Sequence, residues 1–111
     1  MASRKRWLAF ASHSQGKISV DKGAKSALIR RGKSLLPSGV MEARGDFRAG
    51  DVVSLLDERN LEFAKGLVNY GVDEVNRIKG CRSSQIEKIL GYKHSDEIIH
   101  RDNLVVMERS R

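Results

Sequence analysis

The chain has 111 residues, of which 40% are hydrophobic, and a formal net charge of +7. This size suffices for one hydrophobic core and leaves no room for a second domain. No apolar run approaches the roughly 18 residues that suggest a membrane span, and the start of the chain lacks a signal peptide's apolar stretch, so we expect a cytoplasmic protein with no membrane partner. The lone cysteine, Cys81, excludes an internal disulfide and a multi-thiolate metal site.

The positive charge is concentrated in the first third of the chain. Residues 1–33 contain nine Lys or Arg and one acid, a balance of +8, whereas residues 34–111 contain twelve Lys or Arg and thirteen acids. A clustered basic surface attracts phosphates through counterion release, which indicates nucleic-acid binding. The same charges also fit a solvated helix face whose basic residues favour the helix C-terminus. The sequence leaves both interpretations open.

The first predicted elements are a short strand over residues 18–20 and a helix over residues 22–31. Asp21 stands at the N-cap position, where its carboxylate can accept a hydrogen bond from the first helical turn. Apolar residues follow at i, i+3 and i+4, and Gly32 can end the helix in the left-handed conformation. We therefore predict a strand followed by a short capped helix.

Three further strands are predicted in the middle of the chain. Pro37 presets one turn dihedral, while Gly39 and Gly50 permit a positive φ in the connections. The apolar character of residues 52–56 is nearly continuous, which is typical of a strand buried on both faces, as in a closed or nearly closed barrel. The three strands cover residues 40–44, 51–57 and 62–69.

Two short helices and a last strand complete the prediction. Asp73 can cap the first helix, and Ser84 with Glu87 forms a capping box for the second, which ends at Gly91. The apolar run at residues 104–107 predicts a final strand returning to the barrel. The chain is therefore expected to be mainly β with short helices, in the α+β class.

No constellation of residues supports catalysis. The tripeptide at 100–102 spells His-Arg-Asp, as in the catalytic loop of protein kinases, but that loop needs an asparagine five residues after the aspartate, whereas Asn103 is adjacent. The histidines lack metal-ligand spacing, and the dispersed glycines form no phosphate-binding loop. Asp21 and Asp51 are more simply a cap and a turn former. We predict that this chain alone is not an enzyme and holds no cofactor or metal.

Six short motifs are spread along the chain: Lys5-Arg6-Trp7, Val20-Asp21-Lys22-Gly23-Ala24, Ser34-Leu35-Leu36-Pro37-Ser38-Gly39-Val40, Gly66-Leu67-Val68-Asn69-Tyr70, Ile89-Leu90-Gly91-Tyr92 and Ile99-His100-Arg101-Asp102-Asn103. Together they resemble the PUA domain, and more narrowly the PUA domain at the C-terminus of bacterial glutamate 5-kinases. Each motif is weak alone, but their order and spacing are specific and span nearly the whole chain. The pattern departs from the family at the 57–60 hairpin, where Asn60 replaces an expected glycine.

The resemblance implies a PUA-like pseudo-barrel over residues 7–108, preceded by a linker or engineered start at 1–6 and followed by a tail at 109–111. It further implies a non-catalytic domain with a regulatory or assembly role in glutamate 5-kinase, the ATP-dependent kinase of the first step of proline biosynthesis. Its partner would be the glutamate-kinase domain of the same polypeptide, which would hold ATP and magnesium. Trp7 would contact that domain or, alternatively, seal the barrel edge.

The wider PUA family implies an alternative function, the recognition of structured RNA. In that family RNA lies against the first helix and the adjoining strand, and a glycine-containing loop lets the backbone approach. Cationic side chains suit phosphates, and the scarcity of aromatic residues favours shape and backbone contacts over base stacking. The residues that match this surface are Lys22, Gly23, Lys25, Ser26, Arg30, Gly32, Lys33, Ser34 and Leu36.

Overall fold

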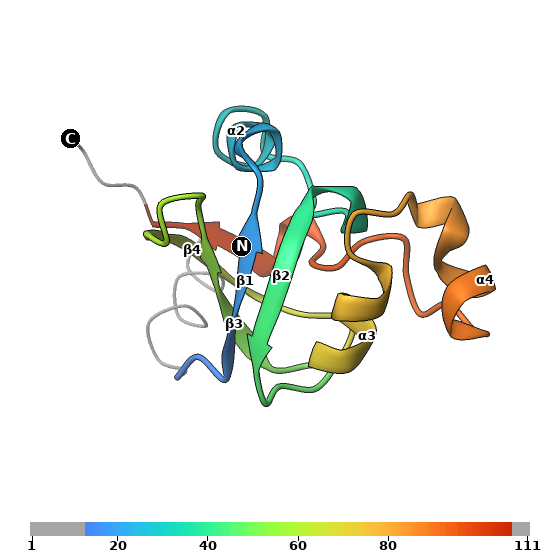
Figure 1. The fold of residues 1–111 in the computed structure, drawn as a ribbon. Helices are drawn as coiled ribbons and strands as arrows, with labels where there is room; N and C mark the ends of the chain where they lie inside the picture. The colour runs from blue at the N-terminus through green and yellow to red at the C-terminus, as the bar shows by residue number, and fades with distance from the viewer. Residues whose placement is uncertain (1–12, 108–111) are drawn as a thin grey trace.

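The computed structural model describes residues 13–107, so Trp7, the predicted linker and the predicted tail lie outside the described part. Five strands form one sheet in the order β2-β1-β3-β4-β5 (Figure 1). All neighbouring strands are antiparallel except β1 and β3, which are parallel. The predicted α+β pseudo-barrel is confirmed. The strands are β1 (Gly16–Val20), β2 (Val40–Gly45), β3 (Val52–Leu56), β4 (Glu62–Leu67) and β5 (Leu104–Val106).

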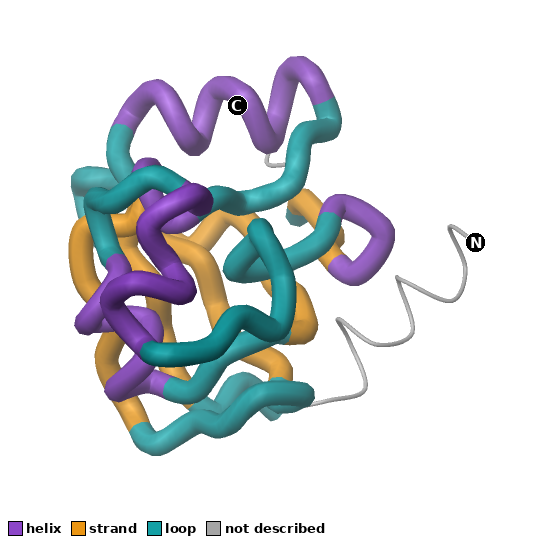
Figure 2. Tube along the Cα trace, turned by 90° about the vertical axis from the view of Figure 1, so that its right-hand side faces the viewer, coloured by secondary structure: helices purple, strands orange, loops and turns teal. Residues whose placement is uncertain are grey.

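The helices lie outside the sheet. Figure 2 shows α2 lying across one end of the strands, and Figure 1 shows α3 beside β2, with α4 on the far side of α3 from the sheet. Three single turns of 3₁₀-helix connect the larger elements. The helical segments are α2 (Lys22–Arg31), η1 (Pro37–Gly39), α3 (Val72–Ile78), η2 (Ser83–Gln85), α4 (Ile86–Leu90) and η3 (Arg101–Asn103).

The helix α2 has the predicted bounds and the predicted ends. The carboxylate of Asp21 accepts a hydrogen bond of 2.7 Å from the backbone N–H of Ala24, and Gly32 ends the helix with a φ of 59°. Leu28 is its buried residue and turns toward the sheet. Local capping rules therefore define this element completely.

The core lies between the inner face of the sheet and the helices. Every residue of β3 is buried, as the continuous apolar run predicts, and Phe47 and Phe63 also lie in the core. Because β3 pairs with β1 on one side and β4 on the other, it is the central strand of the sheet. Its burial on both faces agrees with a nearly closed barrel.

One turn prediction is confirmed and one is wrong. Gly50 has a φ of 95°, and Asn60 occupies the left-handed region at 65° in the β3–β4 hairpin, in place of the expected glycine. The prediction for Gly39 is wrong, because its φ is not positive. It lies in η1, where a Cβ atom would come within 2.5 Å of the Ala24 Cβ. The position requires glycine because η1 and α2 approach closely, not because of backbone conformation.

The caps predicted for the two later helices, Asp73 and Ser84, are both wrong. Helix α3 begins after Gly71, whose N–H donates to Glu74 Oε1 at 2.7 Å, so Asp73 lies inside the first turn. Ser84 belongs to η2, and Gln85 precedes α4 without a side-chain cap. A 3₁₀ turn therefore replaces the expected capping box. The predicted end at Gly91, with a φ of 92°, is confirmed.

A side chain from α3 covers the edge of the sheet at β2. The carboxamide of Asn76 accepts from the N–H of Ala43 and donates to its carbonyl, both at 2.9 Å. These are the two backbone groups through which a neighbouring strand would pair. Asn76 therefore substitutes for a strand at this point and blocks edge-to-edge association.

We expect Asn76→Ala to lower the free energy of unfolding by about 2 kcal/mol, because it leaves the backbone N–H and carbonyl of Ala43 without their partner. Urea unfolding followed by circular dichroism measures this. Asp73→Ala, at an exposed position of the same helix, is the control and should cost less. Equal losses in the two variants would contradict a covering role for Asn76.

Candidate nucleic-acid interface

The outer face of α2 gathers part of the predicted RNA-binding set. Lys22, Ser26 and Arg30 are four residues apart in sequence and exposed, so they form one stripe along the helix. Gly23 is exposed at the start of the helix, and Ile29, 39% exposed, is an apolar residue beside the stripe. The stripe can contact phosphates without rearrangement of the core.

Lys25 does not belong to this stripe. Its Nζ lies 2.8 Å from Asp57 Oδ2 and 5.5 Å from the centre of the Phe63 ring. Asp57 is 4% exposed, and its other carboxylate oxygen accepts from the N–H groups of Arg59 and Leu61 at 2.8 and 3.0 Å. Lys25 thus connects α2 to the β3–β4 hairpin, and its positive charge is paired with the Asp57 carboxylate of the same domain.

The environment of Asp57 also sets the pKa of its carboxyl group. Burial acts to raise this pKa, but hydrogen bonds from Lys25, Leu61 and Arg59 outweigh burial and hold it below its ordinary value. A lowered folded-state pKa stabilises the fold above the unfolded pKa, and this stabilisation is lost as the pH falls through the folded value. The Lys25–Asp57 pair therefore contributes fully at neutral pH and progressively less below about pH 4.

We expect Asp57→Asn to lower the free energy of unfolding at pH 7 by about 1–3 kcal/mol, because Lys25 and two backbone amides lose a charged acceptor. The difference from the parent chain should shrink as the pH is lowered from 5 to 2. Urea titrations across this range measure it, with Glu58→Gln as the exposed neighbouring control. A difference that is independent of pH would contradict the lowered pKa.

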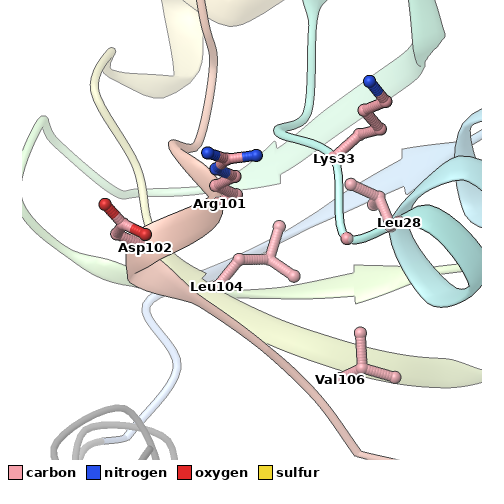
Figure 3. Close-up of a pocket in the computed structure, with 7 residues that line it drawn as sticks. Leu28, Lys33, Arg101, Asp102, Leu104 and Val106 are labelled. Carbon is pink, nitrogen blue, oxygen red and sulfur yellow. The ribbon is translucent and has the colours of Figure 1, made fainter. Parts of the chain in front are cut away.

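The loop after α2 forms one wall of a pocket. This pocket has a volume of about 400 Å³, and Figure 3 shows the side chains that line it, which come from α2, the loop after α2, η3 and β5. Of the predicted set, Gly32 and Lys33 line the pocket, while Leu36, 44% exposed, does not. The lining residues are Leu28, Gly32, Lys33, Arg101, Asp102, Leu104 and Val106.

Hydrogen bonds to a segment far along the chain hold η3 beside the loop that follows α2. Leu35 forms an isolated bridge with Ile99. The Leu35 N–H donates to the Ile99 carbonyl at 2.9 Å, and the Leu35 carbonyl accepts from the Ile98 N–H at 2.7 Å. Ser34 Oγ accepts from the N–H of Arg101 at 2.8 Å. Ser34 therefore supports η3 rather than the exposed stripe, and the structure brings η3 beside α2.

The sequence pattern does not indicate the pocket residues on η3 and β5. Arg101 and Asp102, in the tripeptide that resembles a kinase loop, lie in the single turn η3 and also line the pocket. Asp51 is the predicted turn former, since its carboxylate accepts from the N–H of Arg48 at 2.9 Å. Within residues 13–107, no three His, Cys, Asp or Glu side chains are grouped to hold a metal ion, and no helix there is long and apolar enough to cross a membrane.

Comparison with known families identifies the fold. The PUA domain family model matches residues 16–90, which is more than half of the chain. The chain belongs to the PUA domain family. A solved PUA domain from Aeropyrum pernix K1 shares this fold with a TM-score of 0.57 and 24% identity, covering 78% of this chain and 41% of that one. A PUA domain protein from Thermoplasma acidophilum has a TM-score of 0.53 and 20% identity, over 86% and 55%.

Relatives of higher identity to this PUA domain are longer proteins. The chain is 53% identical to the glutamate 5-kinase of Thermoanaerobacter sp. (strain X514) over 98% of its own length. The match covers 29% of that protein. This PUA domain therefore spans less than a third of the length of the curated relatives it matches.

Proposed function

We propose that this PUA domain is the non-catalytic C-terminal domain of a cytoplasmic glutamate 5-kinase, and that it tunes the activity or the assembly of the kinase region. The observation that carries the proposal is the 53% identity to a glutamate 5-kinase over 98% of this chain, which spans 29% of that protein. The kinase region of the same polypeptide would be the partner and would hold ATP and magnesium.

A chimeric enzyme tests this proposal. The matching segment of the Thermoanaerobacter glutamate 5-kinase is replaced by this chain, and the chimera is compared with the parent enzyme and with the enzyme lacking the segment. ATP consumption with glutamate reports activity, and light scattering reports the oligomeric state. We expect the deletion to change at least one of these properties and the chimera to restore it.

The PUA domain of Aeropyrum pernix is the matched control, because it has the fold but only 24% identity. A chimera containing it should fail to restore the property, since its surface differs. If the deleted enzyme keeps both the activity and the oligomeric state of its parent, the accessory role is wrong.

We propose RNA binding by the outer face of α2 as a second candidate. Its support is the exposed stripe with Lys22 and Arg30 and the charge balance of +8 over residues 1–33. Fluorescence anisotropy with structured and single-stranded RNA at low and physiological salt tests it. We expect tighter binding of the structured RNA, weakened by salt and by Arg30→Glu, because each phosphate contact releases counterions.

Lys88→Glu, on the exposed surface of α4, is the matched control for this measurement. Lys25 is unsuitable for charge reversal, because a glutamate there would face Asp57 and destabilise the fold. Equal loss of binding in Arg30→Glu and Lys88→Glu would mean nonspecific attraction of a polyanion, and RNA recognition by α2 would be rejected.

A further inference from the structure

The pocket between α2 and β5 lies beside the β5 edge of the sheet. Among residues 13–107, which form the strand order β2-β1-β3-β4-β5, β5 pairs only with β4. Met107 N–H donates to the Phe63 carbonyl at 2.8 Å, and Val105 is in register with Lys65. Because antiparallel pairing alternates along a strand, the backbone N–H and carbonyl of Val106 face away from β4. The Val106 side chain lines the pocket at this edge.

The pocket combines an apolar side with a cationic end. Leu28, Leu104 and Val106 supply aliphatic surface from two different elements. Figure 3 shows the side chains of Lys33 and Arg101 above Leu104 and Val106, with Leu28 next to Lys33, while Asp102 lies on the far side of Arg101 from Lys33. An occupant that matches this arrangement presents an aliphatic group to one end and an anionic group to the other.

We propose that this groove binds an extended, acidic segment of a partner protein, which adds to β5 as a sixth strand. In an extended segment, side chains at i and i+2 lie on the same face, about 7 Å apart. One aliphatic side chain can therefore contact Leu104 and Val106 while an acidic side chain two residues away reaches Lys33. Backbone hydrogen bonds to Val106 supply the affinity common to strand addition.

The lining residues favour a peptide over a single-stranded nucleic acid. Recognition of single-stranded nucleic acid relies on aromatic side chains that stack with bases. None of the seven residues that line the pocket is aromatic, and three are branched aliphatic residues. A strand edge with paired donor and acceptor also matches a peptide backbone. This inference goes beyond the accessory role, because it needs no kinase region, and the chimera experiment stands or fails independently of it.

Nuclear magnetic resonance titration of the full ¹⁵N-labelled chain tests the proposal. The probe is the capped peptide acetyl-Ser-Val-Ser-Glu-Ser-amide, in which Val and Glu share one face of a strand. Its matched control carries Lys in place of Glu. We expect saturable shifts at the amides of Gly32, Lys33 and Val106, and about tenfold weaker binding of the Lys peptide.

Charge exchange makes the test specific. In the Lys33→Glu chain the preference should reverse, so that the Lys peptide binds more tightly than the Glu peptide. Lys22→Glu, at the far end of α2, should leave the original preference unchanged. A probe methylated on its backbone nitrogens should bind at least about tenfold more weakly, because methylation removes the donors needed for strand pairing.

Three outcomes would overturn the proposal. The first is the absence of shifts at Val106 with the Glu peptide in large excess. The second is equal affinity for the Glu and Lys peptides. The third is saturable shifts at the same amides with an RNA oligonucleotide but not with the peptide, which would assign the groove to RNA.

Discussion

Tyr70→Phe should lower the free energy of unfolding by about 2–4 kcal/mol, because the lost hydroxyl is the centre of a buried hydrogen-bond group. Tyr70 is 0% exposed. Its hydroxyl donates to the Ser95 carbonyl at 2.6 Å and accepts from the N–H groups of His94 and Ser95 at 3.0 and 2.9 Å. The ring remains in phenylalanine, so the loss reports the polar contacts and not a cavity.

Chemical unfolding of the parent and the variant measures this difference. Tyr92→Phe is the matched control, because the Tyr92 hydroxyl bonds to Glu74 on the surface and its side chain is 42% exposed. We expect the control to remain close to the parent. If Tyr70→Phe loses no more stability than Tyr92→Phe, the connection from α4 to β5 does not depend on the Tyr70 hydroxyl.

Gly39→Ala should lower the free energy of unfolding by about 1–3 kcal/mol through overpacking. The added Cβ would lie 2.5 Å from the Cβ of Ala24, a separation that forces η1 and α2 apart. Because η1 lies between α2 and β2, this displacement also strains the entry to the edge strand. Thermal and urea unfolding both report the change.

A double variant distinguishes this contact from a general effect on the turn. Ala24→Gly removes the opposing Cβ, so Gly39→Ala should cost less in the Ala24→Gly background than in the parent chain. Gly23→Ala is the control, since its added Cβ would meet only Asp21 Oδ1, at 3.5 Å, and alanine favours the helix. Additive losses in the double variant would contradict a direct contact between residues 24 and 39.

The elements that the sequence predicts well are those whose determinants are local. The bounds of α2 follow from Asp21 and Gly32, which act within one turn of each end. The burial of β3 follows from its own five residues. The caps at Asp73 and Ser84 were wrong because long-range contacts decide that region, as where the Ser83 hydroxyl donates to the Asp96 carbonyl at 2.7 Å.

The candidate site divides in the same way. Its α2 stripe could be predicted, since helical spacing brings Lys22, Ser26 and Arg30 together. The role of Lys25 could not, because its partner Asp57 is 32 residues away in the sequence. The pocket depends on an even longer separation, that between Ser34 and Arg101, which is 67 residues. Spacing within one element carries no information about such contacts.

The two edges of the sheet differ in their capacity to pair with a further strand. At β2 the Ala43 backbone is already satisfied by Asn76, whereas within residues 13–107 no second strand pairs with the outward-facing groups of Val106 on β5. A chain that pairs only through β5 can join one other strand and is then saturated. Two copies that met at this edge would form a closed two-fold pair, and further copies could not add to it. The asymmetry of the sheet thus favours strand pairing at β5 over pairing at β2, where Asn76 covers Ala43, and opposes growth into fibres.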